Sequence, residues 1–350
     1  MIKENKAVVL LGKGEVELQN KELPDLKEDE LLIKVSACNL CTSEYGIYSG
    51  ARKADFPYMF GHEWSGFVED TGSAVKRFKK GDYVVGCYEY DAASLEAQLG
   101  HSSCAPRAYA FDALNPDGYY GRFRACAQYV IQKEVSTFAM NKEIDKSEAA
   151  FLEPLATVVS GIRRLHLQPS DRVLVIGAGT MGILNALVAK AYGCTVYQSE
   201  MMKKKINTAR ELGISVIDIS NGDPVEIIRK ESGITGFDVV IVAVGVSAAY
   251  QQAFQLVKDK EGTVLIFAAG FPEPEFCITP NEVHYRKMTI IGTYTADFQD
   301  FREAANLLSE KKINVSKLVE KRINYKNVKE AFEEAMVPGA FRISVIFDES

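Results

Sequence analysis

The feature that most constrains this chain is a glycine-rich turn between an apolar strand and a helix. Residues 172–176 read RVLVI, and the segment GAGTMG follows them at once and opens an apolar helix. In this setting the first glycine permits a tight turn, the second lets a pyrophosphate approach the backbone, and the third lets the helix pack closely on the strand. The sequence therefore predicts that a dinucleotide binds at Gly177, Gly179, Thr180, Met181 and Gly182.

Glu200 indicates which dinucleotide to expect. It ends the next predicted strand, where a carboxylate can accept hydrogen bonds from the adenosine ribose. Its charge should repel the 2'-phosphate of NADP, although Lys203, Lys204 and Lys205 follow it and could instead form a solvated cationic helix face. We favour NAD over NADP, and we count Lys205 among the candidate coenzyme contacts.

Short Val- and Ile-rich segments alternate with helical patterns from Asp171 onward, as in FDVVIVAVG and GTVLIFAAG. Such near-continuous apolar strands are typical of a parallel sheet that is buried on both faces, so we expect an α/β fold with a doubly wound, Rossmann-type sheet. Amphipathic helices over 298–310 and 328–336 and a strand over 341–347 are predicted to end the chain. The ends of two sheet strands would add four coenzyme contacts: Val244, Gly245, Ala268 and Gly270.

The first 150 residues differ, because short β-like runs such as 31–37 are separated by loops rich in Gly, Pro and Tyr. The 350 residues carry 41 basic and 47 acidic side chains without a basic stripe, so we expect no nucleic-acid partner. The apolar runs are too short for a membrane span or a signal peptide. Seven scattered cysteines then indicate a reduced, cytoplasmic compartment.

Two short segments of this first region carry metal-ligand chemistry, CNLCTSE at 38–44 and GHE at 61–63. Thiolate and imidazole are ligands that zinc prefers, and a site with three protein ligands leaves a fourth position for water or substrate. Taken alone, Cys41 and His62 are equally compatible with a small buried cysteine and a structural histidine. The two residues by themselves leave both interpretations open.

Several ordered motifs together resemble the zinc-dependent medium-chain alcohol dehydrogenases, and most of all their polyol, sorbitol-type branch. Besides the two segments above, they are GDYV at 81–84, EPL at 153–155 and the glycine turn, and the resemblance covers essentially the whole chain. It implies a GroES-like, β-rich catalytic domain over 1–155, an NAD-binding Rossmann domain over 156–289, and a carboxy-terminal segment over 290–350 that returns to the catalytic domain. It also implies a homodimer or homotetramer.

The resemblance further implies roles for single residues. Cys41 and His62 would hold the catalytic zinc, and either Glu63 or Glu153 would complete the ligand set. Glu44 stands where the family usually has an aspartate and would orient His62. Ser43 would be the proton-relay hydroxyl. Thr293 and Arg342 would be two further coenzyme contacts.

The chain departs from the family pattern at the lobe that usually holds a second, structural zinc. In place of four closely spaced cysteines, residues 86–127 contain only Cys87, Cys104 and Cys126. We therefore expect one zinc ion per chain. The stretch after Ser43 also lacks the histidine that often passes the proton to solvent in this family.

We predict oxidation of a secondary hydroxyl in a polyol, a sugar alcohol or a polyol phosphate to the ketone. Glu153 supports this, as do tyrosines in the pocket loops, which could equally be packing residues: Tyr45, Tyr48, Tyr88, Tyr90, Tyr119 and Tyr120. A substrate phosphate would need cations, and the same loops offer Arg52, Lys53, Arg122 and Arg124. The alternatives are a dehydrogenase for another secondary alcohol, such as a hydroxy amino acid, a zinc-free quinone or enone reductase, and a non-catalytic NAD-binding sensor.

Overall fold

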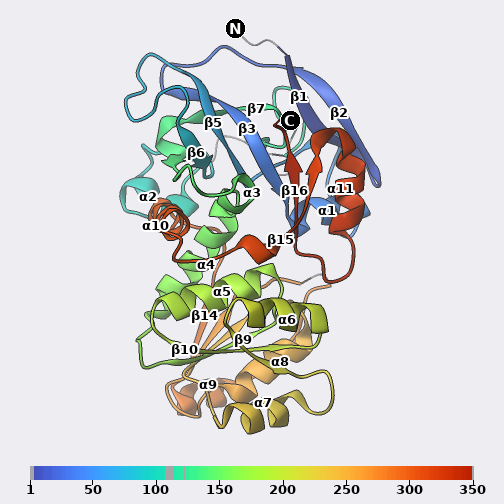
Figure 1. Ribbon diagram of the computed structural model, residues 1–350. Helices are drawn as coiled ribbons and strands as arrows, with labels where there is room; N and C mark the ends of the chain where they lie inside the picture. The colour runs from blue at the N-terminus through green and yellow to red at the C-terminus, as the bar shows by residue number, and fades with distance from the viewer. Residues whose placement is uncertain (1–3, 107–113, 122, 271, 349–350) are drawn as a thin grey trace. The chain divides into compact units, whose positions relative to one another are not determined.

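The computed structural model divides the chain into two compact units (Figure 1). One unit consists of Met1–Ala156 with Ala296–Ser350, and the other is Thr157–Thr295. The structure describes residues 4–106, 114–121, 123–270 and 272–348. The second unit extends beyond the expected limit of 289, because strand β14 (Thr289–Gly292) pairs with β13 (Thr263–Ile266) and so belongs to the nucleotide-binding sheet.

The first unit is built from β-strands of both ends of the chain. In Figure 1 the red strands β15 and β16 lie beside the blue strand β3, and the order of the larger sheet is β15-β16-β3-β5-β6-β8, with β7 also paired to β3. A smaller sheet has the order β2-β1-β4. The strands are β1 (Glu4–Gly12), β2 (Glu15–Glu22), β3 (Glu30–Leu40), β4 (Tyr58–Met59), β5 (Trp64–Thr71), β6 (Tyr83–Gly86), β7 (Tyr129–Lys133), β8 (Thr137–Ala139), β15 (Val319–Asn324) and β16 (Arg342–Ile346).

Strand β3 is the centre of this unit. It reads ELLIKVSACNL, is buried along nearly its whole length, and pairs with β5, β7 and β16. Because successive side chains point to opposite faces and nearly all of them are buried, both faces of β3 are covered, which fits an apolar sequence without strict alternation. The helices of the first unit are α1 (Thr42–Ser49), α2 (Leu95–Gln98), α3 (Lys146–Ala149), α10 (Phe298–Ser309) and α11 (Val328–Ala335), with α4 (Leu152–Leu165) running across the boundary between the units and short 3-10 helices at Ser102–Cys104, Glu134–Ser136, Ser316–Leu318 and Tyr325–Asn327.

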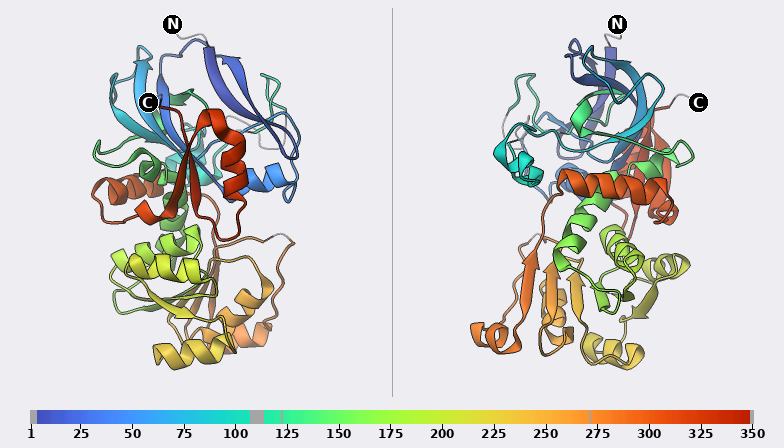
Figure 2. Two further views of the ribbon diagram at one scale, coloured as in Figure 1. Left: turned by 45° about the vertical axis from the view of Figure 1, so that its right-hand side comes forward. Right: turned by 90° about the vertical axis from the view of Figure 1, so that its left-hand side faces the viewer.

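The second unit contains the predicted parallel sheet, in the order β11-β10-β9-β12-β13-β14, with helices on either side of it (Figure 2). The order reverses between β9 and β12, and the carboxyl ends of strands at such a reversal form the usual nucleotide crevice. The remaining elements are β9 (Arg172–Ile176), α5 (Thr180–Ala191), β10 (Thr195–Glu200), α6 (Lys203–Glu211), β11 (Ser215–Asp218), α7 (Pro224–Ser232), β12 (Val239–Val242), α8 (Ser247–Leu256) and α9 (Pro280–Arg286).

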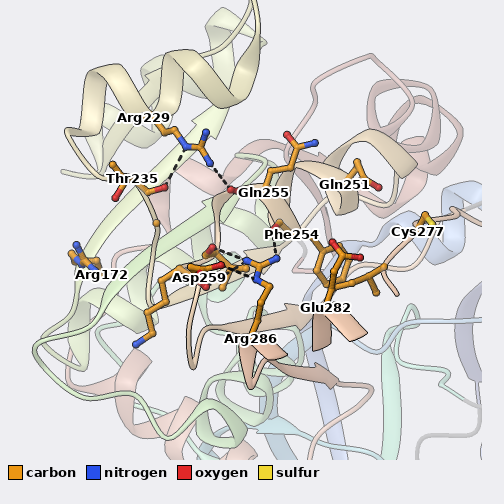
Figure 3. A pocket seen from close by; sticks show the side chains of 14 residues that line it. Arg172, Arg229, Thr235, Gln251, Phe254, Gln255, Asp259, Cys277, Glu282 and Arg286 are labelled. Carbon is orange, nitrogen blue, oxygen red and sulfur yellow. Dashed lines mark hydrogen bonds and ion pairs between the residues drawn. The ribbon is translucent and has the colours of Figure 1, made fainter. Parts of the chain in front are cut away.

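The amino ends of these strands border a polar pocket of about 680 Å³, which we call the capping pocket (Figure 3). Two of its arginines bind the carbonyl oxygens at the end of helix α8. Arg286 donates to the carbonyls of Phe254 and Val257 at 3.1 and 3.2 Å, and Arg229 donates to that of Gln255 at 2.7 Å. The last carbonyls of a helix lack partners within the helix, so these contacts satisfy them.

Among the described residues, the structure contains no helix with the length and apolar character needed to cross a membrane.

Candidate active site

The pairing of β3 with β5 brings the two metal-ligand segments together. Cys38 is opposite Trp64, and the amide of Asn39 donates to the carbonyl of Glu63 at 2.8 Å. Continuing this antiparallel register puts Leu40 opposite His62 and Cys41 opposite Gly61, so Cys41 and His62 are near neighbours across the two strands. The chain passes through Gly61 with a φ of 118°, and a Cβ there would lie 2.2 Å from the amide nitrogen of Cys126, so this approach requires glycine.

Helix α1 begins at the first metal-ligand candidate. Cys41 is its N-cap, and the side chain of Glu44 completes a capping box by accepting a hydrogen bond from the Cys41 amide at 2.9 Å. The other oxygen of the same carboxylate lies 2.8 Å from Nδ1 of His62. Glu44 therefore contacts both the start of the helix and the imidazole, which is an arrangement suited to orienting His62.

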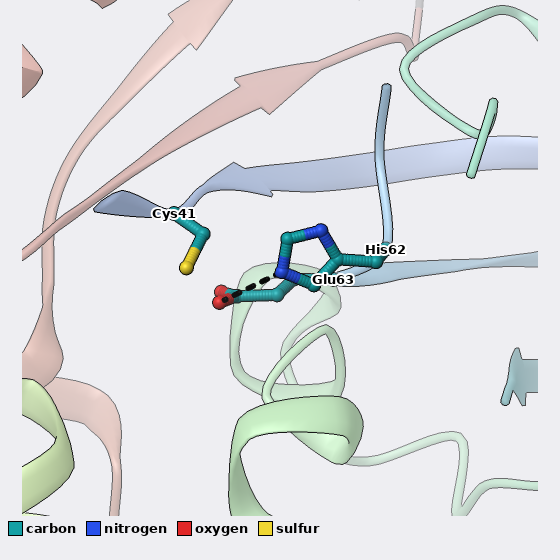
Figure 4. A group of neighbouring side chains, drawn as sticks. All are labelled: Cys41, His62 and Glu63. Carbon is teal, nitrogen blue, oxygen red and sulfur yellow. Dashed lines mark ion pairs between the residues drawn. The ribbon is translucent and has the colours of Figure 1, made fainter. Parts of the chain in front are cut away.

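A thiol, an imidazole and a carboxylate converge at this point (Figure 4). One ligand atom from each of Cys41, His62 and Glu63 lies within 4.8 Å of the others. Glu153, at the start of α4, brings a second carboxylate, with one oxygen 3.9 Å from Nε2 of His62. We call these four residues the metal site. Sulfur, nitrogen and oxygen donors of these types fit a zinc ion.

Arg342, which the resemblance assigns to a coenzyme phosphate, lies at the metal site in this structure. Its guanidinium is buried, donates to both carboxylate oxygens of Glu63 at 2.7 to 3.1 Å, and lies 3.5 Å from the sulfur of Cys41. The reason is the sheet register, since β16 pairs with the end of β3 and so brings Arg342 to the metal site. A buried carboxylate is costly without a cation, and Arg342 neutralises Glu63.

The glycine turn has the geometry that a phosphate site requires. Gly177 has a φ of 97°, and a Cβ on Gly182 would lie 2.0 Å from the carbonyl oxygen of Gly177. Gly179 is the N-cap of α5, so Thr180, Met181 and Gly182 form the first turn of that helix. The amino end of a helix favours negative charge, which supports the assignment of the phosphates to this turn.

Three of the other candidate coenzyme residues lie at this turn. Glu200 accepts hydrogen bonds from the amides of Ala178, at 2.8 Å, and of Met201 and Met202. The Nζ of Lys205 would lie 3.9 Å from a Cβ on Gly179, and the Val244 side chain would lie 3.2 Å from a Cβ on Gly177.

The remaining candidates have other neighbours. Gly245 and Gly270 approach so closely that a Cβ on Gly270 would lie 2.1 Å from the Gly245 carbonyl oxygen. The Ala268 carbonyl accepts a hydrogen bond from Tyr250, and the Thr293 methyl lies beside Gly161.

The comparisons with known proteins agree with this geometry. Residues 27–142 match the alcohol dehydrogenase GroES-like domain, and residues 180–310 match the zinc-binding dehydrogenase domain. The chain belongs to the zinc-dependent medium-chain alcohol dehydrogenase family. It is therefore an oxidoreductase acting on CH–OH groups, in a family that binds zinc and uses NAD(P).

Relatives of this dehydrogenase span nearly its full length. Sorbitol dehydrogenase from Ovis aries is 29% identical over 361 residues, covering 99% of this chain and 98% of that protein. D-xylulose reductase from Saccharomyces cerevisiae is 28% identical over 343 residues, covering 94% and 93%. The crystal structure of a zinc-binding dehydrogenase from Sinorhizobium meliloti 1021 bound to NADP has a TM-score of 0.87 at 27% identity, and the match covers 99% of this chain and 100% of that one.

Burial and charge perturb the titration of the dehydrogenase's metal-site groups. Burial raises the pKa of Glu153 to about 7, and the charge of Glu63 adds to this effect while His62 opposes it. Burial alone would lower the pKa of His62, but the charges of Glu44 and Glu153 raise it well above its ordinary value. The same pairing lowers the pKa of Glu44 against the effect of its burial. These opposing shifts are typical of a site that handles protons or a cation.

Ser43, the expected proton-relay residue, lies in the first turn of α1. Its hydroxyl oxygen is buried, and its side chain interacts with Glu44 and helps to lower the pKa of that carboxyl. A serine hydroxyl both donates and accepts hydrogen bonds, so this one can also receive a hydrogen bond from a bound alcohol.

The pocket-loop tyrosines divide into different environments. Tyr48 is a packing residue, stacked on Phe332 with ring centroids 4.6 Å apart, and Tyr119 donates to Gln19. Tyr88 instead reaches the metal site, because its hydroxyl donates to Glu153. The sequence placed Tyr88 only in a general group of pocket residues. Its position two residues after the end of β6 was the available signal that its side chain would lie near the end of the sheet.

The candidate cations for a substrate phosphate lie in two places. Arg52 and Lys53 line a pocket of about 530 Å³ together with Lys13. Arg124 forms an ion pair with Asp117 and donates to the carbonyl of Gly121. Arg122 lies outside the described residues.

Proposed function

We propose that this chain is an NAD-dependent zinc polyol dehydrogenase that oxidises a secondary hydroxyl of a polyol, sugar alcohol or polyol phosphate to the ketone. The observation that carries the proposal is the convergence of Cys41, His62 and Glu63 within 4.8 Å, with Glu153 beside them. The full-length similarity to sorbitol dehydrogenase and D-xylulose reductase supports the substrate class. In the polyol branch that the sequence resembles, a glutamate stands at the position of Glu153.

The protein groups of the metal site have separate tasks in this proposal. Cys41, His62 and Glu63 hold the zinc ion, with Glu153 as the other carboxylate within reach. When bound, zinc lowers the pKa of an alcohol and polarises a ketone, and NAD accepts hydride. Glu44 holds His62 in the orientation that presents Nε2. Ser43 accepts the proton of the alcohol and passes it toward solvent.

One zinc ion per chain is part of the proposal. Cys104 is exposed, whereas Cys87 and Cys126 are buried, and Cys126 contacts Cys38 in the core. These different environments support the absence of a shared structural zinc. Metal analysis of the purified protein should give close to one zinc per chain, and two would contradict this part.

NAD is the proposed coenzyme. The carboxylate of Glu200 sits at the carboxyl end of β10 and is held against the glycine turn by the amide of Ala178. There it can accept from a ribose diol and repel a 2'-phosphate. A similar structure has NADP bound, and lysines follow Glu200 in the sequence, so kcat/KM should be measured with both NAD and NADP. A higher kcat/KM with NADP than with NAD would refute this preference.

We also propose a homodimer or homotetramer. Strand β14 is at the edge of the second unit's sheet and exposes Thr289 and Ile290. An exposed apolar edge strand tends to pair with another strand, and a second copy of this chain would provide it. Sedimentation at micromolar concentration should give a dimer or tetramer rather than a monomer.

The substrate class is tested by steady-state kinetics with NAD on C4 to C6 polyols, their phosphates, simple alcohols and hydroxy amino acids. We expect kcat/KM to be highest for a polyol or polyol phosphate. A higher value for ethanol would refute the polyol assignment and leave the zinc mechanism intact. Turnover of a hydroxy amino acid alone would favour the alternative substrate class, and binding of NAD without any turnover would favour a sensor.

A further inference from the structure

A cavity of about 820 Å³ within the first unit opens beside His62. Its volume lies in the range of about 300–1,000 Å³ that is common for small-molecule sites. Next to the imidazole it is walled by aromatic side chains, Tyr88, Phe123 and Trp64. A molecule in this cavity would therefore lie against the metal site on one side and aromatic rings on the other.

Tyr88 is held rigidly in this wall. Its ring lies 4.9 Å from that of Phe123 and meets that of Phe301 edge-on at 5.2 Å, and Phe123 lies 5.7 Å from the His62 ring. The Tyr88 side chain is buried. Aromatic neighbours on two sides restrict the ring plane, so the direction of the hydroxyl is fixed as well.

This hydroxyl donates to one carboxylate oxygen of Glu153, while the other oxygen lies 3.9 Å from Nε2 of His62. The two carboxylates of the metal site thus have different partners. Arg342 pairs with Glu63 and neutralises its charge. The phenol of Tyr88 is neutral, so it directs Glu153 without cancelling the negative charge with which Glu153 can accept a further hydrogen bond.

We propose that Tyr88 is a positioning residue that holds Glu153 beside His62, at the wall of the cavity, so that Glu153 accepts a hydrogen bond from a second hydroxyl next to the reacting carbinol. The enzyme then prefers vicinal diols to isolated secondary alcohols. A substrate without the neighbouring hydroxyl leaves the buried carboxylate without this donor, and sites built around such a hydrogen bond discriminate strongly. This inference rests on the proposed oxidation of a secondary alcohol and names the residue that selects its substrate.

The test compares Tyr88→Phe with Tyr325→Phe in the full-length, zinc-loaded enzyme. Both variants remove only the hydroxyl of a buried tyrosine, and Tyr325 stacks on Phe347 and accepts a hydrogen bond from Gln128. The ratio of kcat/KM for 2,3-butanediol to that for 2-butanol should fall about tenfold or more in Tyr88→Phe. It should stay within about twofold of the wild-type ratio in Tyr325→Phe.

Zinc release to a chelator gives a readout that does not depend on turnover. Tyr88→Phe should lose zinc at least severalfold faster than wild type, because the negative charge of Glu153 is no longer held beside the ligand His62, whereas Tyr325→Phe should not. In a Glu153→Gln background, Tyr88→Phe should change neither the substrate ratio nor the release rate further, since its effect acts through Glu153.

Two results would overturn the inference. One is an unchanged substrate ratio and release rate in Tyr88→Phe, and the other is an equal loss of activity on both alcohols, which would indicate a structural role only. If the wild type oxidised neither alcohol nor any polyol, the proposed function would fail. The chelator experiment would still decide whether Tyr88 positions Glu153.

Discussion

The metal site and the capping pocket both gather charged side chains, but those charges have different partners. In the metal site, a thiol, an imidazole and two carboxylates face one another, with Arg342 against Glu63. In the capping pocket, the guanidinium groups of Arg229 and Arg286 face backbone carbonyls at the end of α8. A cluster of ionisable residues therefore indicates chemistry when its polar atoms converge on a common point, and indicates structure when the backbone already occupies them.

The largest expected effect is at the metal site. Cys41→Ser and His62→Ala should remove zinc and nearly all activity, because each takes away a proposed metal ligand. Both variants should still bind NAD, since the glycine turn lies in the other unit. Metal analysis, turnover with NAD and NAD binding by calorimetry check this. Full activity in metal-free protein would refute the mechanism.

A substitution in the capping pocket should lower stability and leave the activity of the folded enzyme unchanged. Arg286→Gln should lower the free energy of unfolding by roughly 2–3 kcal/mol, because it removes hydrogen bonds from a charged group and leaves helix-terminal carbonyls without a partner. The kcat/KM of the folded enzyme should stay near the wild-type value. Urea unfolding and steady-state kinetics on the same preparation measure both quantities.

Lys287→Gln is the matched control for this experiment. This variant also replaces a cation with glutamine, at the neighbouring position. Lys287 pairs with Glu261, and both side chains are largely exposed. Its effect on unfolding should stay within about 0.5 kcal/mol. A loss of activity in Arg286→Gln without a loss of stability would mean that the capping pocket takes part in function, and the contrast between the two clusters would then be wrong.

Glu44 tests whether part of the metal site is also structural. Glu44→Gln should weaken zinc binding or lower activity about 10- to 100-fold, because an amide cannot accept from both His62 and the Cys41 amide. A chelator titration and kinetics measure the effect. If only stability changed, the capping box would be the whole role of Glu44.

The fold was predictable because its signals are local. The strand, glycine turn and helix at 172–191 are contiguous, and buried parallel strands such as Val239–Val242 need apolar side chains on both faces. The end of the second unit was less predictable. Strand β14 ends at Gly292, but a glycine there does not by itself show that this strand still belongs to the parallel sheet, so the pairing with β13 sets the limit.

The metal-site residues that belong to short sequence motifs were predictable. Cys41, His62 and Glu63 come from two short segments that β3 and β5 pair. The partner of Arg342 was not predictable, because 279 residues separate it from Glu63 and only the register of β16 on β3 unites them. Tyr88 and Glu153 are 65 residues apart, and their contact likewise depends on how a loop leaves the sheet.

The smallest expected effect is a pH dependence of stability at Asp238, which pairs with two residues that line the capping pocket, Arg172 and Lys258. Asp238 accepts hydrogen bonds from Arg172 at 2.9 Å and from Lys258 at 3.1 Å. Burial alone would raise the pKa of Asp238, but these hydrogen bonds hold it well below its ordinary value. A carboxylate whose pKa is lowered by folding stabilises the protein fully above its unfolded pKa of about 4, and this contribution is lost as the pH falls toward the folded pKa.

Asp238→Asn should therefore be less stable than wild type by a constant amount above about pH 5, and the difference should shrink as the pH falls through about 4. Urea unfolding of both proteins at pH 7, 5 and 4 measures it, with Asp259→Asn as the control at a carboxylate that is 84% exposed. The metal-site groups should not contribute to this difference, because both proteins carry them unchanged. A difference that grew on acidification would mean that Asp238 is not held as an ion by Arg172 and Lys258. The charges of the capping pocket would then not act as the structural network described here.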